Sequence, residues 1–279
     1  MLEVAIVGAG EIGGMLAHLL ARRGTARSIR LIDETAGSAE GQALDIAEAG
    51  AIDGFATRVI GSTELMDAAG ADVVVVADRR GGGEWTGEDA VAILRRLARS
   101  APHAFIVCAG ALQRELVERG VRELQIPRER IVGSAPEALV AAARAIVALE
   151  LDASPRDVAL SVMGVPPDRI VIGWEDGTVA GWAMTRVMTE PVRRQLSGRI
   201  SMLWPPGPFA LASASSKVIE AVAGHSQSVT VCFVAPDDSF GARTRTAALP
   251  VRLGLSSVDI MLPPLGVAER VALDNALLL

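Results

Sequence analysis

The sequence is poor in several reactive side chains. It has no tyrosine, two cysteines, three histidines and a single lysine, Lys217, among its 27 basic residues. The two cysteines, Cys108 and Cys232, lie inside the apolar runs AFIVCAG and VTVCFVA, so we expect small buried side chains in strands and no disulfide. No CxxC or Cys/His spacing indicates a metal site.

An uninterrupted apolar run of about 18 residues, which a membrane span needs, is also missing. The amino terminus has no basic region and its apolar stretch is interrupted by Glu11, so we expect no signal peptide, and the cytoplasm is the simplest compartment. The net charge is −6 and the arginines are scattered. Without a basic cluster, neither nucleic acid nor an anionic membrane is an expected partner.

Half of the 279 residues are hydrophobic, which indicates a globular chain of one large or two modest domains. In the first half, short β-rich runs alternate with helical segments. Strands are expected over 3–7, 28–32, 57–60, 72–77, 104–108 and 130–132, and helices over 11–23, 38–50, 87–100 and 112–119. This alternation predicts an α/β fold with right-handed crossovers and a parallel sheet covered on both faces.

The pattern changes near residue 150. After a helix over 135–150 come the runs DVALSVMG and DRIVIGW, a turn at EDG, helices near 187–200 and 210–223, and strands up to Pro264. This order predicts an α+β second part with antiparallel strands. We place the boundary near residue 145, with domains over 1–145 and 146–279 and the long helix as the hinge element.

Gly8, Gly10 and Gly13 form a G-x-G-x-x-G pattern that follows an apolar strand and opens an amphipathic helix. Gly8 permits a tight turn, Gly10 lets the backbone approach a pyrophosphate, and Gly13 lets helix and strand pack closely. The positive end of the helix and its free N–H groups would receive the pyrophosphate. We expect Glu11 and Ile12 of the same turn to belong to this cofactor site.

Asp33 stands 20 residues beyond Gly13, at the end of the second predicted strand. Its carboxylate can accept both ribose hydroxyls and would repel a 2′-phosphate, which favours NAD over NADP. The alternative is a turn that needs glycine but binds nothing. The lack of tyrosine excludes the short-chain dehydrogenases, which use a Tyr–Lys pair. A lysine-dependent β-hydroxyacid dehydrogenase would have only Lys217, which we expect at a solvated helix position.

The stretch GSAEGQALDIAEAG (37–50), with the preceding LIDE, resembles the lactate/malate dehydrogenase family, especially its malate branch. The similarity continues nearly end to end, through ADVVVVA, IPRERIVGSA, DGTVAG, FALASASSKVIEAV and LPVRLG. The resemblance implies an NAD-binding Rossmann domain with a doubly wound parallel sheet, followed by an α+β substrate domain. It also implies NAD as cofactor, a small carbonyl substrate, and a homodimer or higher homo-oligomer.

The resemblance implies a compact catalytic set as well. NADH delivers hydride to a 2-keto acid, a histidine backed by an aspartate supplies the proton, and one arginine binds the substrate carboxylate. The histidine position of the family's G-G-H-G-D turn falls on Pro166 of MGVPPDR. The aspartate and the arginine fall on Leu139 and Ala142, and only the outer arginine of that motif remains, as Arg144.

A second arginine of the family lies on a mobile loop, P-R-K-P-G-M-x-R, and polarises the carbonyl. The corresponding stretch is DRRGGGEWTGED, where both arginine positions fall on glycine, Gly81 and Gly87, although a one-residue shift would bring Arg80 to the first. The family's asparagine after the fifth strand falls on Gly110. Efficient keto acid reduction by this mechanism is not expected, because general acid catalysis alone contributes about 10²–10⁴ in rate.

Other polar side chains lie in or beside segments that face the active site in the family, and two of them, Asp168 and Arg80, are weak substitutes for the lost groups. We expect the whole set to carry surface charge or local salt bridges: Asp168, Arg169, Arg80, Glu137 and Arg114. Structural or solvated positions are expected for the three histidines, His18, His103 and His225.

We keep three hypotheses. The leading one is a family member that binds NAD(H) but has lost or redirected the 2-hydroxy acid dehydrogenase chemistry. The second is a working NAD-dependent oxidoreductase on a different carbonyl or hydroxy substrate, with Asp168 or a bound water as proton donor. The third is a non-catalytic interaction subunit that pairs with a competent paralogue through the family's dimer surface, to which helix 38–50 belongs.

Overall fold

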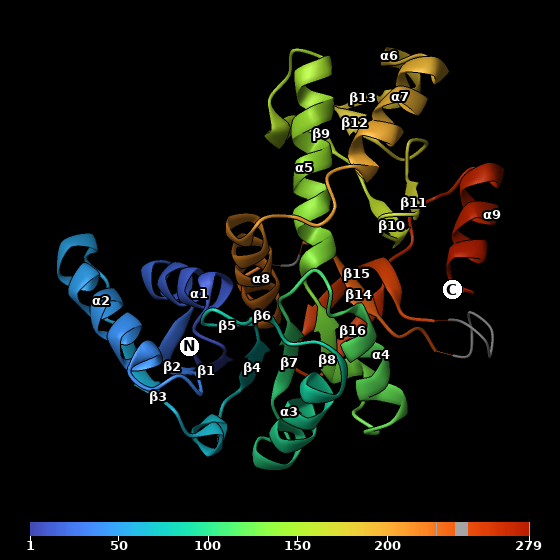
Figure 1. Cartoon of the computed structure of the whole chain (residues 1–279). Coiled ribbons are helices and arrows are strands. Elements are labelled where there is room, and N and C mark those ends of the chain that lie inside the picture. The colour runs from blue at the N-terminus through green and yellow to red at the C-terminus, as the bar shows by residue number, and fades with distance from the viewer. Residues whose placement is uncertain (227, 238–244, 279) are drawn as a thin grey trace.

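A computed structural model describes residues 1–226, 228–237 and 245–278 (Figure 1). The first half contains six parallel strands in the order β3-β2-β1-β4-β7-β8. Their bounds are Leu2–Val7 (β1), Ala26–Ile32 (β2), Arg58–Ser62 (β3), Val73–Val76 (β4), Phe105–Cys108 (β7) and Ile131–Gly133 (β8). The predicted parallel sheet is confirmed, and the all-valine strand β4 is buried along its whole length, as a strand covered on both faces should be.

Four helices connect these strands: α1 (Glu11–Arg22), α2 (Ser38–Asp53), α3 (Gly87–Ser100) and α4 (Arg114–Arg122). Two short 3₁₀ turns, η1 (Leu65–Ala68) and η2 (Arg128–Arg130), complete the connections. In Figure 1, α1 and α2 lie to one side of the strands and α3 and α4 to the other, and α3 packs against α4. This is the doubly wound arrangement that right-handed crossovers produce.

The second half is α+β, as predicted. The helices are α5 (Ala135–Glu150), α6 (Met184–Val187), α7 (Glu190–Ser201), α8 (Pro208–Val222) and α9 (Val267–Ala276), with one 3₁₀ turn, η3 (Pro155–Asp157). The strands are β9 (Val158–Ala159), β10 (Val162–Val165), β11 (Arg169–Ile172), β12 (Thr178–Val179), β13 (Trp182–Ala183), β14 (Thr230–Val234), β15 (Ala247–Gly254) and β16 (Ser257–Ile260). The ladders among these strands are antiparallel.

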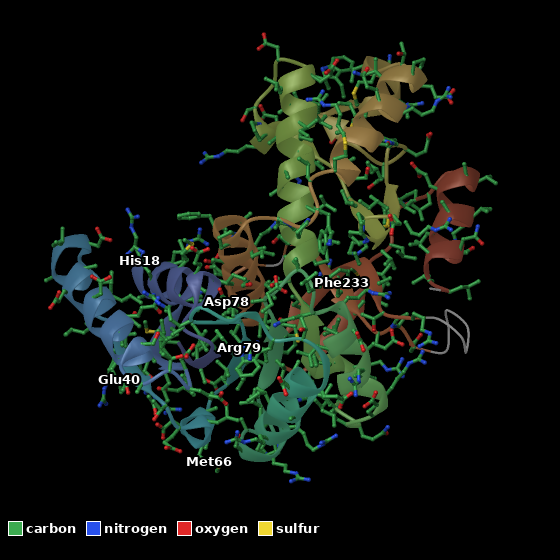
Figure 2. The ribbon with its side chains drawn as sticks, in the orientation of Figure 1. His18, Glu40, Met66, Asp78, Arg79 and Phe233 are labelled. Atoms are coloured by element: carbon green, nitrogen blue, oxygen red, sulfur yellow. The ribbon has the colours of Figure 1, made fainter. Side chains whose placement is uncertain are left out.

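One sheet continues across both halves, because β14 pairs with β8 at Phe233 and Gly133. Phe233, labelled in Figure 2, packs over Gly133, where any Cβ would be crowded by its ring. Helix α5 runs through residue 145 without a break. The proposed division into residues 1–145 and 146–279 therefore stays a prediction.

The stretch after β4 forms a hairpin that the sequence did not predict. Strand β4 ends at Val76, one residue before the predicted end, and β5 (Asp78–Arg79) then pairs antiparallel with β6 (Gly83–Glu84). We call residues 78–84 the acidic hairpin after its two carboxylates, Asp78 and Glu84, although Arg79 and Arg80 balance their charge. Figure 1 shows β5 and β6 above the carboxyl ends of β4 and β7, beside α1.

Both cysteines are free and fully buried, Cys108 in β7 and Cys232 in β14, which confirms the expected packing role. Burial raises the pKa of the Cys108 thiol to about 12. Across the described residues, none of the helices has the length and apolar character needed to cross a membrane.

Candidate cofactor site

The glycine turn between β1 and α1 has the predicted geometry. Gly8 has a φ of +113°, and its N–H donates to the carbonyl oxygen of Ile32 at 2.7 Å. A Cβ on Gly13 would overlap the Gly8 carbonyl oxygen, so this contact between helix and strand requires glycine. Gly8 thus makes the tight turn and Gly13 the close packing, which is the local frame that a dinucleotide site needs.

Asp33 lies at the end of β2 and is only 4% exposed. One carboxylate oxygen accepts the N–H groups of Ala9 at 2.8 Å and Arg80 at 3.1 Å, and the other accepts that of Thr35 at 2.9 Å. Burial alone would raise the pKa of this carboxyl, but the three N–H donors outweigh it and hold the pKa below its ordinary value. Asp33 is therefore an ionised acceptor at the predicted ribose position.

A second carboxylate, that of Asp78 in β5, lies over the glycine turn. Its Oδ1 accepts the N–H groups of Ile12 at 3.0 Å and Gly13 at 3.1 Å, in the first turn of α1. Its carbonyl oxygen accepts the N–H of Gly10 at 2.9 Å, and a Cβ on Gly10 would overlap the carboxylate itself. The close approach that Gly10 was predicted to allow is thus used by Asp78, which Figure 2 labels next to α1.

Glu84 makes the same kind of contact on the other side of the acidic hairpin. Its two carboxylate oxygens accept the N–H groups of Ala111 at 2.9 Å and Leu112 at 2.8 Å, in the turn that leads into α4. A Cβ on Gly110, the position predicted to correspond to the family's asparagine, would overlap this carboxylate. Burial and the nearby charge of Asp78 raise the pKa of Glu84 above its usual value.

Further contacts hold the acidic hairpin in place. The Gln113 amide accepts the N–H of Gly110 at 3.0 Å and donates to the carbonyl oxygens of Ala77 at 3.2 Å and Trp85 at 3.4 Å. The Arg79 guanidinium lies 4.5 Å from the centre of the Trp85 ring, a cation–π contact. Both flanks of the hairpin are therefore attached to Gln113, the residue that precedes α4.

Some features of this site fit a dinucleotide, and one does not. The glycine turn, the amino-terminal end of α1 and Asp33 suit the pyrophosphate and the ribose. The N–H groups of Ile12 and Gly13, which the pyrophosphate would use, already bind Asp78. In this conformation the site does not accept the pyrophosphate, and Glu11, the remaining predicted contact residue, is exposed.

The positions predicted from the sequence to correspond to the family's catalytic residues carry no acid or base. Leu139 is fully buried in the core, Ala142 is half-buried on the same helix, and Pro166 is buried in the turn between β10 and β11. Gly81 and Gly87 have φ values of +70° and +62° and flank β6.

The candidate substitutes lie apart from one another. Asp168 and Arg169 are exposed in the β10–β11 hairpin, and Arg80 is exposed but contributes its backbone N–H to Asp33. Arg114 donates to the carbonyl oxygen of Thr246 at 2.9 Å. None of these four groups lies in a shared hydrogen-bond network that the structure describes.

The expectation of a solvated Lys217 is wrong. Its side chain is 34% exposed and its ammonium binds the carboxylate of Glu137, which is 5% exposed. The second Glu137 oxygen accepts the N–H of Val231 at 2.8 Å. The pair joins α5 to α8 and lines, with Arg144 and Arg156, a cavity of about 350 Å³. The spacing of apolar residues within one helix could not reveal that Lys217 pairs with Glu137, because the two residues lie 80 positions apart in the sequence.

The three histidines agree with the expected structural or solvated roles. His18 in α1 lies 3.4 Å from the carboxylate of Asp53 at the end of α2 and packs edge-on against Phe55. His103 and His225 are exposed in turns.

The residues that sequence reasoning missed are Asp78, Glu84 and Gln113. A weak signal existed, because Asp78 ends the buried run DVVVVAD at the edge where parallel strands present ligand-binding groups. Its partner N–H groups lie 65 and 66 residues earlier in the chain, so the contact itself carries no sequence signature.

Comparison with known proteins gives a consistent result. Residues 2–84 match the family profile described as the lactate/malate dehydrogenase, NAD binding domain. Malate dehydrogenase from Thermomicrobium roseum is 29% identical over 98% of this chain and 94% of the relative. Malate dehydrogenase from Thioalkalivibrio sulfidiphilus is also 29% identical, over 99% of this chain and 96% of the relative.

Solved structures share the fold. Malate dehydrogenase from Salinibacter ruber superposes with a TM-score of 0.86 at 23% identity, covering 98% of this chain and 93% of that one. Lactate dehydrogenase from Cryptosporidium parvum, in complex with lactic acid and nicotinamide adenine dinucleotide, superposes with a TM-score of 0.86 at 22% identity, covering 98% and 94%.

Proposed function

Because the chain belongs to the lactate/malate dehydrogenase family and its residues 2–84 form the family's NAD-binding domain, we propose that it is an NAD(H)-binding protein that has lost or redirected the 2-hydroxy acid dehydrogenase activity. It is an α/β protein of the family's fold, with NAD as its cofactor type. We propose that it acts in the cytoplasm, where its two free cysteines would stay reduced.

One observation supports this proposal: the positions that we align with the family's proton donor and substrate-binding residues hold side chains without acid, base or charge. Pro166 has no titratable group, buried Leu139 replaces the aspartate, and Ala142 replaces the arginine that would bind the substrate carboxylate. Loss of general acid catalysis removes about 10²–10⁴ in rate. Loss of the arginine also removes the group that orients the substrate.

The test is turnover of oxaloacetate and pyruvate with NADH by the purified chain, followed by a broader carbonyl panel. We expect no turnover of the two keto acids above the rate without protein. Asp33→Asn is the control for a contaminant, because it alters only this chain's cofactor site. Conventional turnover that Asp33→Asn abolishes would refute the loss of activity, and turnover of another carbonyl that Asp168→Asn abolishes would favour redirection.

A second candidate function is association with another copy of the chain or with a competent paralogue. The large apolar side chains Leu44 and Ile52 on α2 are 62% and 89% exposed, on the helix that forms part of the family's dimer surface. Burying such side chains favours association. Sedimentation analysis should show a dimer that Ile52→Glu dissociates. Met66→Glu, which alters a 63% exposed apolar side chain on η1, should leave it intact.

A further inference from the structure

We propose that the acidic hairpin is an intramolecular occupant of the dinucleotide site, so that NAD(H) binds only when residues 78–84 leave the cleft. The inference rests on the NAD-binding part of the proposed function. It adds Asp78 as the residue that determines cofactor affinity and Glu84 as its partner on the same hairpin.

Asp78 uses the N–H donors that an anionic ligand of α1 would need. The N–H groups in the first turn of a helix have no partner within the helix, and an anion binds there because they and the helix dipole point at it. In α1 the N–H groups of Ile12 and Gly13 both donate to one oxygen of Asp78, which is 8% exposed. The Asp78 carboxylate thus stands where a phosphate oxygen would stand.

Charge separates a pyrophosphate from the carboxylate of Asp78. A pyrophosphate carries two negative charges, and a like charge a few ångströms away costs free energy in a partly buried site. Arg79 and Arg80 balance the two carboxylates of the hairpin in sum. The group at the N–H donors of Ile12 and Gly13 is nevertheless the Asp78 carboxylate. The pyrophosphate and this carboxylate therefore exclude one another by charge as well as by volume.

The two strands of the hairpin bring both of its carboxylates to the cleft. Asp78 and Glu84 are directly paired across its two strands, which puts their side chains on the same face. Two like charges in such a pair repel one another. Here each carboxylate accepts two backbone N–H groups of the cleft. Asp78 accepts those of Ile12 and Gly13, and Glu84 accepts those of Ala111 and Leu112. In this position each carboxylate of the pair is thus stabilised by two N–H donors of the cleft.

The hairpin and the residues after it align with the family's mobile loop, whose two arginine positions fall on Gly81 and Gly87 in this chain. Two other arginines, Arg79 and Arg80, remain in the hairpin. The group that reaches the N–H donors at the start of α1 is nevertheless the carboxylate of Asp78. The segment that is mobile in the family thus carries the carboxylate that occupies the site.

The experiment is calorimetric titration of NADH into the full chain and three variants. Asp78→Ala removes the carboxylate, and Asp78→Asn keeps its volume and an acceptor oxygen but removes its charge. Asp72→Ala is the matched control, because Asp72 stands at the opposite end of β4 and also accepts a backbone N–H, that of Glu3 at 2.8 Å. We expect affinity to rise in the order wild type, Asp78→Asn, Asp78→Ala, with Asp72→Ala equal to wild type.

The expected gain in NADH affinity depends on the fraction of molecules in which the hairpin occupies the site. If the hairpin occupies the site in about nine of ten molecules or more, its removal raises the apparent affinity by about tenfold or more. Tight NADH binding by the wild type that Asp78→Ala leaves unchanged would overturn the inference while supporting NAD(H) binding. No binding by any variant, all of them folded, would overturn both the inference and the NAD-binding part of the proposed function.

Hydrogen exchange provides a readout that needs no ligand. The amides of Ile12 and Gly13 should be protected in the wild type and exchange faster in Asp78→Ala, while those of Ala111 and Leu112 report on Glu84. Added NADH should protect the first pair again and expose the hairpin amides. Equal exchange of Ile12 and Gly13 in wild type and Asp78→Ala would overturn the proposed contact even where the variant binds NADH.

Discussion

Replacing Lys217 by methionine is expected to lower the free energy of unfolding by about 2–3 kcal/mol. The carboxylate of Glu137 is 5% exposed and binds the Lys217 ammonium and the Val231 N–H. Methionine keeps most of the volume of the lysine stem but leaves this buried carboxylate with the single N–H donor. Removing one partner of a buried ion pair costs about 3–5 kcal/mol, and solvent at the 34% exposed lysine reduces that value here.

The assay is urea denaturation followed by tryptophan fluorescence, with the midpoint compared at constant slope. Glu137→Gln keeps an acceptor for Val231 and should cost only about 1 kcal/mol, because Lys217 can turn to water. The double variant should therefore be more stable than the sum of the single changes predicts, by about 1 kcal/mol or more. Arg199→Met is the matched control. It breaks an exposed ion pair with Glu150 between α7 and α5 and should cost less than about 1 kcal/mol.

Two results would refute this reasoning. A midpoint for Lys217→Met equal to that of Arg199→Met would mean that water reaches the Glu137 carboxylate. Additive effects in the double variant would mean that the two groups do not interact energetically.

Three further predictions concern the core and the cofactor site. Iodoacetamide at pH 8 should leave native Cys108 and Cys232 unmodified and label both after unfolding, because burial raises the pKa of both thiols; rapid labelling of the native protein would contradict their packing. Gly13→Ala should lower the stability by about 1–3 kcal/mol in thermal unfolding, since its Cβ would overlap the Gly8 carbonyl oxygen, whereas an unchanged midpoint would show that helix and strand can separate freely. Because the folded pKa of Asp33 lies below its ordinary 3.8, its stabilising contribution is present above that pH and is lost as the pH falls through the folded value. Asp33→Asn should flatten the dependence of unfolding free energy on pH in that range, and parallel pH curves would exclude the effect.

The fold of the first half of the chain and the glycine turn of the cofactor site could be predicted because they depend on residues that are close together in the sequence. Runs such as VVVV in β4 show burial on both faces, and the alternation of strands with amphipathic helices fixes a parallel, right-handed order. The spacing of Gly8, Gly10 and Gly13 specifies a turn whose geometry only glycine permits. The position of Asp33 in the site could be predicted as well, because the second parallel strand ends beside that turn.

Two contacts could not be predicted from the sequence and are seen only in the tertiary structure: the carboxylate that lies in the cofactor site and the ion-pair partner of Lys217. Asp78 accepts the N–H groups of Ile12 and Gly13, which lie 66 and 65 residues earlier in the chain. Lys217 binds Glu137, which lies 80 residues earlier. Hydropathy and turn chemistry describe each segment separately, whereas a hydrogen bond between distant segments depends on how the elements pack. The sequence thus determined that this chain has the frame of an NAD site. The tertiary structure decided that a carboxylate of the same chain lies in it, because only packing brings β5 onto the end of α1.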